Sequence, residues 1–492
     1  MTTPISRNSL FRTKSVEQSI RDTDEPGKKL RKDLTAWDLA IFGVAVVIGA
    51  GIFTLTARTA GNVAGPAVSL AFVFAAIACG LTALCYAEFA STVPVAGSAY
   101  TFSYATFGEL AAWIIGWDLL LEFALAAAVV SKGWSQYLGQ VFDRGAAVVE
   151  IGGVSFDWGA VLLIAVLTTL LALGTKLSSR VSMIAVAIKV GVILLVIVVG
   201  LSFFDSANLT PFIPESVPGE DGQGLTQSLF SWATGAGNST FGWYGLLAAA
   251  SLVFFAFIGF DVVATAAEET KNPQRDLPRG ILGSLLVVTI LYVAVTIVLT
   301  GMVPYTDLAG DDATLATAFA LNGATWAKNI ISIGALAGLT TVVMVMLLGQ
   351  TRVLFAMSRD GLVPRGLART GDRGTPVRIT VIVGVVCAIL AGFVEFGTLE
   401  EMVNIGTLFA FLLVSIGVVV LRRTRPDLPR GFKVPLVPYV PILAVLSCLW
   451  LMVNLSVETW LRFVVWMLLG LVMYFAYGRR HSLVGRSASE QE

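Results

Sequence analysis

The sequence is almost without histidine and holds few cysteines. Its one histidine is His481, and its four cysteines, Cys79, Cys85, Cys387 and Cys448, all lie in apolar segments. Neither residue type has the spacing of metal ligands, and the cysteines do not form the pattern of a disulfide framework. We therefore expect no bound metal, no histidine proton relay in the membrane, and thiols that pack as small apolar side chains.

Charge is also scarce in this chain. Charged residues make up 13% of the sequence and hydrophobic residues 56%, and the mean hydropathy is +0.81. A soluble protein carries roughly 25% charged residues. The composition therefore predicts an integral membrane protein that has the lipid bilayer, and not nucleic acid, as its partner.

Catalytic and cofactor-binding motifs are missing as well. The sequence has no HExxH motif, no GxSxG motif and no phosphate-binding P-loop. We expect a protein that is not an enzyme and needs no cofactor. An intramembrane enzyme and a transporter-like sensor are the alternatives from other classes.

What the sequence has in abundance is apolar segments long enough to cross a membrane, which takes about 20 residues each. Twelve such segments predict an all-α protein: 38–60, 66–90, 108–131, 157–175, 180–203, 242–266, 279–303, 327–354, 376–396, 400–421, 435–455 and 457–478. With both termini in the cytoplasm, most lysines and arginines fall on the inner side, as the positive-inside rule requires. Residues 1–36 are polar, so we expect no cleavable signal peptide and a multi-pass protein of the cell membrane.

Helix interruptions divide the twelve segments into two halves. The first segment contains Gly49-Ala50-Gly51, and the sixth contains Gly259 and Asp261 at a matching place. Each glycine weakens a helix interior by ~1 kcal/mol, and interrupted helices in both halves are typical of a secondary transporter's binding site. The alternative is that these small residues only let helices pack closely.

Five segments per half force the halves into opposite orientations, which predicts a 5+5 inverted repeat. The expected divisions are a cytoplasmic tail, a first repeat, a second repeat, two additional helices and a second tail, at 1–33, 34–203, 204–421, 422–478 and 479–492. The two additional helices could serve packing or dimerisation. We expect a monomer or a loose homodimer.

The interruptions would offer backbone groups of opposite polarity. The outer half of the first helix would begin near Gly51 with free N–H groups, which attract a carboxylate. Carbonyl groups from Phe255 to Ile258 could accept hydrogen bonds from an ammonium group. An α-amino acid carries both groups, although other zwitterions would fit equally well.

Four charged residues inside predicted spans are candidates for function. Lys189 lies about nine residues into the fifth segment, where a lysine costs ~2.5–3.5 kcal/mol, so it is either a cation of the core or a side chain that snorkels to the surface. Asp118 and Glu122 share one helix face and could contact substrate, carry protons or pair with a neighbouring helix. Asp261 follows the second interruption and could cap backbone amides or contact substrate.

Several motifs together resemble the amino acid/polyamine/organocation superfamily, in particular its cationic amino acid transporter branch. They are DLTAWDLAIFGVAVVIGAGIF, PVAGSAYTFSYATFGELAAWIIGWDLLLEF, FFAFIGFDVVATAAEETKNPQRDLPRGI and LGQTRVLFAMSRDGLVP. The resemblance covers about residues 34–480 and implies a sodium-symporter-like core of interrupted helices 1 and 6 that works by alternating access.

The resemblance also implies roles for individual residues. It implies that substrate is bound at Gly49, Ala50, Gly51, Ile52, Glu122, Phe255, Ala256, Ile258 and Asp261. It casts Phe255 as the gate and places Lys189 where sodium-coupled relatives hold a sodium ion. Ala50 occupies a position where many members of the family have a hydroxyl residue. A side-chain hydrogen bond to the substrate from that position is therefore not available here.

We therefore expect a secondary active amino acid transporter that is proton-coupled and independent of sodium. Cationic and small neutral L-amino acids are both open as substrates. An amino acid exchanger and a polyamine carrier are the alternatives within the transporter class.

Overall fold

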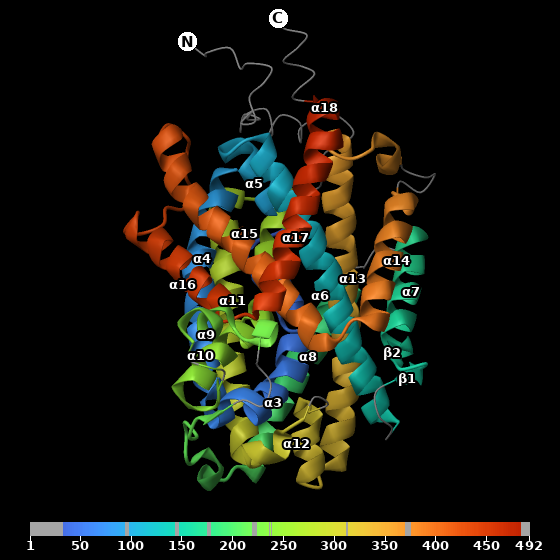
Figure 1. Ribbon diagram of the computed structural model, residues 1–492, viewed down its shortest axis with the longest axis vertical. Helices are drawn as coiled ribbons and strands as arrows, with labels where there is room; N and C mark the ends of the chain where they lie inside the picture. The colour runs from blue at the N-terminus through green and yellow to red at the C-terminus, as the bar shows by residue number, and fades with distance from the viewer. Residues whose placement is uncertain are drawn as a thin grey trace, which may run out of the picture.

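The structure is a computed structural model that describes residues 33–93, 98–142, 147–174, 179–218, 224–235, 237, 239–310, 313–369 and 375–483. Long helices run side by side along the longest axis of the molecule, with α5 and α18 at one end and α12 at the other (Figure 1). The long helices are α4 (Val68–Thr92), α6 (Glu109–Val141), α8 (Ser179–Gly200), α11 (Pro273–Met302), α13 (Thr325–Arg359), α15 (Phe396–Thr424) and α17 (Val457–Met473).

Shorter helices complete the bundle. Apolar helices of 10–17 residues are α2 (Ala36–Val47), α7 (Trp158–Ala172), α14 (Val377–Phe393) and α16 (Tyr439–Val453), beside α10 (Gly242–Val253). The remaining helical elements are η1 (Gly51–Leu55), α3 (Thr56–Thr59), η2 (Ala60–Ala64), η3 (Gly65–Ala67), α5 (Ser98–Thr106), η4 (Leu201–Phe203), η5 (Ser206–Leu209), η6 (Gly224–Thr226), α9 (Leu229–Thr234), η7 (Phe254–Phe257), η8 (Asp261–Glu269), η9 (Tyr305–Leu308), α12 (Leu315–Leu321), η10 (Arg365–Ala368), η11 (Tyr474–Gly478) and α18 (Arg479–His481).

Burial separates a central group of helices from a peripheral one. Of the most apolar 18 residues of α6, 94% are buried. Of the corresponding residues in the stretch Val457–His481, only 22% are buried. The outward faces are apolar, for example at Ile77, Met183 and Val472, which are 54%, 59% and 64% exposed. Apolar exposure on this scale fits a surface covered by lipid, and the described residues include eight helical stretches long and apolar enough to cross a membrane.

The chain is mostly but not entirely helical. An antiparallel hairpin joins β1 (Val148–Ile151) to β2 (Val154–Asp157) through Gly152-Gly153, and β3 (Val217–Pro218) pairs with β4 (Ser239–Thr240). These four strands were not predicted from the sequence, because they are short and lie between the apolar segments. Asp157 ends the hairpin and caps α7 by accepting a hydrogen bond from the Ala160 amide.

The first predicted interruption is present. α2 begins at a Thr35–Asp38 capping box and ends at Val47, and Ile48 is extended, with ψ of 96°. Helical structure resumes as the π-helical turn η1 at Gly51. The prediction of an interrupted first helix is therefore confirmed.

The second predicted interruption is present as well. α10 gives way to the 3₁₀ turn η7, Ile258 is extended, and helical structure resumes as the 3₁₀ helix η8. Gly259 has a φ of +116°, and an added Cβ would lie 2.7 Å from Cγ1 of Val46. Only glycine fits both the backbone conformation and the contact.

A buried acid ties α4 to the end of α15 and to the segment between α15 and α16. Glu88 accepts hydrogen bonds from Arg422 at 2.8 and 2.5 Å and from the Val434 amide at 2.7 Å, and it forms an ion pair with Arg430 at 3.3 Å. We call these four residues the Glu88 cluster. It holds the last helices of the chain against the first half of the bundle.

The described C-terminal segment is also fastened to the bundle. The Ser482 hydroxyl and Tyr474 hydroxyl donate to Glu109 at the start of α6, and the Leu483 amide donates to the carbonyl of Asp360 at the end of α13 at 3.1 Å. Residues far apart in the sequence therefore meet at one end of the two long helices α6 and α13 (Figure 1).

Candidate substrate site

The two interruptions touch each other at Gly51 and Ala256. An added Cβ at Gly51 would overlap the Cα of Ala256 and would lie 2.9 Å from its nitrogen. The neighbouring Gly49 is different, because the nearest atom to a Cβ there would be a Val342 methyl group at an ordinary 3.5 Å. Gly51 therefore lets the backbones of the two interrupted helices come into direct contact.

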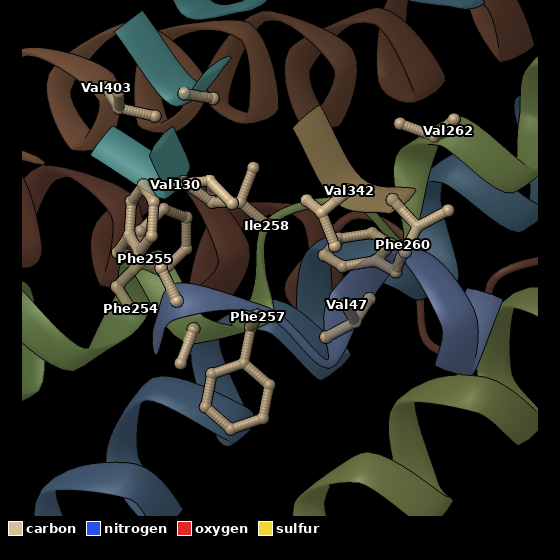
Figure 2. Close-up of a cluster of buried hydrophobic side chains, with 14 of the residues drawn as sticks. Val47, Val130, Phe254, Phe255, Phe257, Ile258, Phe260, Val262, Val342 and Val403 are labelled. Carbon is tan, nitrogen blue, oxygen red and sulfur yellow. The ribbon is translucent and has the colours of Figure 1, made fainter. Parts of the chain in front are cut away.

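A small cavity of ≈ 20 Å³ lies beside this contact. Its wall consists of backbone from both interruptions and of apolar side chains from α6 and α13: Val46, Val47, Gly49, Ala50, Gly51, Ala126, Val130, Phe255, Ile258, Val342 and Met346. Figure 2 shows Val47, Val130, Ile258 and Val342 gathered around the interruption. The space holds about one water molecule, so admission of a larger ligand requires the walls to move apart.

The polar groups available to a ligand here are those of the backbone. The first N–H groups of a helix have no partner within it, and helical structure after the first interruption resumes at the cavity wall. A carboxylate is favoured at such a helix start. On the other side, the Phe255 carbonyl accepts one hydrogen bond, from the Ile258 amide at 3.2 Å, and has a second lone pair left for a donor.

Lys189 lies on the α2 side of the first interruption. Its Nζ atom donates to the Ala45 carbonyl at 2.6 Å, and the residue is 1% exposed. Its stem crosses Gly338 of α13, where an added Cβ would lie 2.9 Å from the Lys189 Cγ. The ammonium group therefore points into the bundle toward α2 and not toward the surface.

Three acidic residues lie buried near the second interruption. Asp118, Glu122 and Asp261 are 0%, 2% and 2% exposed and interact electrostatically as a group. Both carboxylate oxygens of Asp118 and Oδ1 of Asp261 have no hydrogen-bond partner among the residues that the structure describes. None of the three lines the small cavity.

Residues 34–476 match the family described as Amino acid permease. The chain belongs to this family.

Three relatives of the permease are similar over nearly their whole length. The Branched-chain amino acid permease BcaP of Bacillus subtilis (strain 168) is 47% identical, covering 97% of this chain and 99% of the relative. The Methylthioribose transporter of the same strain is 41% identical, covering 97% and 100%. Cationic amino acid transporter 4, vacuolar, of Arabidopsis thaliana is 31% identical, covering 98% and 97%.

These relatives confirm the superfamily resemblance and the prediction of a transporter that is not an enzyme. Of the predicted substrate residues of the permease, the cavity is lined by Gly49, Ala50, Gly51, Phe255 and Ile258. Ala256 contacts Gly51, and Ile52 is fully buried outside the cavity wall. Glu122 and Asp261 lie apart from the wall, and Lys189 binds the Ala45 carbonyl of α2.

Two residues that the sequence analysis missed hold the ends of the interrupted helices in the permease. Asn404 of α15 donates to the carbonyl oxygens of Ser251 and Leu252, at 3.0 and 3.4 Å, in the last turn of α10. Tyr292 of α11 donates to the Val47 carbonyl at 2.8 Å, at the end of α2. A polar amide in an apolar span was a usable signal for Asn404. Nothing local marked Tyr292.

Proposed function

We propose that this permease is a secondary active transporter of neutral aliphatic L-amino acids. The observation that carries the proposal is the meeting of two interrupted helices beside a cavity that has backbone polar groups and apolar side chains in its wall. The backbone would bind the charged groups common to all α-amino acids. The side chains would select among amino acids by shape and polarity.

The apolar wall favours an uncharged substrate side chain. Val130, Val342 and Ile258 offer dispersion contacts but no hydrogen bonds. A charged side chain placed there would lose its hydration without compensation. The 47% identical relative is named as a branched-chain amino acid permease, which agrees with an aliphatic substrate.

Cationic amino acids are the second candidate substrates. Asp118, Glu122 and Asp261 form a buried acidic group near the second interruption, and carboxylates attract a guanidinium or ammonium group. A plant relative is named as a cationic amino acid transporter. We place cationic substrates second because none of these three acidic residues lines the cavity wall.

The proposed architecture has twelve spans in an inverted repeat, with spans 1–5 within 34–203, spans 6–10 within 204–421, and two further spans within 422–478. Two contacts support this plan. Lys189, in the proposed fifth span, binds a carbonyl of the first, and Asn404, in the tenth, binds a carbonyl of the sixth. Equivalent contacts are what an inverted repeat would produce. Both termini and the tails 1–33 and 479–492 would lie in the cytoplasm, and the protein would work in the cell membrane as a monomer or loose homodimer.

The proposed coupling ion is the proton. Lys189 supplies a cation to the core at α2, so no sodium ion is needed there. The substrate would enter and leave by alternating access, with Phe255 as the gate in the wall of a cavity that at ≈ 20 Å³ is too small for an amino acid. Ile52, Ala256, Glu122 and Asp261 complete the proposed substrate site around Gly49, Ala50, Gly51 and Ile258.

Uptake into proteoliposomes tests the proposal. Radiolabelled leucine, arginine and methylthioribose are each offered in sodium-free buffer, with and without an inward proton gradient. We expect the gradient to drive leucine accumulation, with arginine at least tenfold slower. Faster arginine or methylthioribose uptake would overturn the substrate assignment. A sodium requirement, or leucine movement only in exchange for internal amino acid, would overturn the coupling.

A further inference from the structure

A second and much larger cavity lies one helical turn beyond the small one. It has a volume of ≈ 470 Å³ and shares no lining residue with the cavity at the interruptions. We call it the vestibule. Its wall is formed by Leu55, Arg58, Thr59, Asn62, Val63, Leu252, Gly310, Gly397, Glu400 and Glu401.

The vestibule is continuous in sequence with the proposed substrate site. Leu55 is the last residue of η1, the turn that begins at Gly51, and Leu252 lies in the last turn of α10 before Phe255. A molecule in the vestibule would therefore stand next to both interrupted helices. Its volume falls in the range of ≈ 300–1,000 Å³ typical of small-molecule sites.

Glu400 gives the vestibule an unsatisfied acceptor. The residue is 3% exposed, and its Oε1 atom is buried without a hydrogen-bond partner among the described residues. The adjacent Glu401 is satisfied, because its Oε2 atom accepts from the hydroxyl groups of Ser456 and Thr459, both at 2.6 Å. A buried acceptor without a donor is costly, so Glu400 is suited to receive a donor from a ligand.

Arg58 gives the same cavity a positive group. Its guanidinium lies over the Phe396 ring, 5.6 Å from the centroid, at the start of the helix that carries Glu400. Arg58 and Glu400 both line the vestibule, and the two side chains interact electrostatically. A guanidinium has five N–H donors, so it can bind a carboxylate in addition to its other neighbours.

We propose that the vestibule is a second binding site, which takes the zwitterion of an α-amino acid before it reaches the cavity at the interruptions. The ammonium group would donate to Oε1 of Glu400, the carboxylate would accept from Arg58, and an aliphatic side chain would lie on Leu55 and Leu252. The inference rests on the proposed function and adds to it a site with side-chain charges. The two sites together would bind two amino acids to one chain.

Equilibrium binding of radiolabelled leucine to the purified, monodisperse protein tests the vestibule site. We expect two leucines per wild-type chain at saturation. Glu400→Gln keeps the shape but removes the charge, so one class of sites should weaken roughly ten- to hundredfold while the other remains. Glu395→Gln removes an exposed acid at the start of the same helix that does not line the vestibule, and it should leave both classes intact.

The outcomes separate this inference from the proposed function. One leucine per wild-type chain, together with normal leucine uptake, overturns the vestibule site and leaves the transporter assignment standing. An unchanged stoichiometry and affinity in Glu400→Gln also overturns the site, because Glu400 would then be a structural carboxyl group. Absence of both binding and uptake in the wild type overturns both proposals. The wild-type stoichiometry decides the matter even if Glu400→Gln does not fold.

Discussion

The ammonium group of Lys189 lies 2.6 Å from the carbonyl oxygen of Ala45, two residues before α2 ends. The C-terminal end of a helix carries a partial negative charge that a cation stabilises. Here that end is buried in the bundle and not in water, because Lys189 and Val47 are 1% and 3% exposed. The lysine thus compensates a helix end that the interruption leaves inside the protein.

Replacing Lys189 should uncouple transport from the proton gradient. Lys189→Ala removes both the charge and the donor to Ala45, so gradient-driven leucine accumulation should fall at least tenfold in sodium-free proteoliposomes. Lys433→Ala removes an exposed lysine and should behave as wild type. A monodisperse Lys189→Ala protein that still concentrates leucine would refute the coupling role.

The two glycines of the first interruption should respond differently to the same substitution. Gly51→Ala places a methyl group against the Ala256 backbone and should destabilise the fold by about 1–3 kcal/mol. Gly49→Ala fits at 3.5 Å from Val342 and should keep the melting temperature of the wild type in detergent. Adding Ala256→Gly should not restore the stability of the Gly51→Ala protein, because the Cα of residue 256 remains in place. Equal melting temperatures for the two single variants would contradict the close approach.

Asn404 should matter more than an asparagine of similar burial. Asn404→Leu leaves the Ser251 and Leu252 carbonyls without their donor, at a cost of about 1–3 kcal/mol, and should slow leucine uptake. Asn454→Leu is the matched control, because the Asn454 amide donates within its own helix, to the Trp450 carbonyl at 2.8 Å. Similar effects of the two changes on stability and uptake would argue against a special role for Asn404.

The Glu88 cluster should be a main determinant of stability. Glu88→Gln leaves the charges of Arg422 and Arg430 without their acid, and breaking such a buried group costs about 3–5 kcal/mol. Asp427→Asn is the control, because its partner Arg425 lies with it at the surface, and it should change stability little. Thermal unfolding in detergent measures both. A Glu88→Gln protein as stable as the control would show that the cluster contributes little.

The interruptions could be predicted from the sequence because their cause is local. Gly49, Gly51 and Gly259 lie inside apolar segments that would otherwise be helical. A glycine destabilises a helix interior, so glycines at these places indicate a break in the helix. Lys189 could be singled out from local sequence as well, because the apolar residues around it offer no partner for its charge.

The contacts that stabilise the interruptions could not be predicted in this way. Tyr292 binds a carbonyl 245 residues away, and Asn404 binds one 153 residues away. The identity of a tyrosine or asparagine does not indicate such a partner. The distance between the side chain and a remote carbonyl depends on how whole helices pack. The vestibule could not be predicted for the same reason, because Arg58 and Glu400 lie far apart in the sequence.

The fastening of Ser482 to Glu109 and of Leu483 to Asp360 has a mechanical consequence. The segment Ser482-Leu483 thereby links α6 and α13, the two helices that also supply Val130 and Val342 to the cavity wall. We expect two helices linked in this way to move as one unit. A wider cavity would then require the interrupted helices to move relative to that unit.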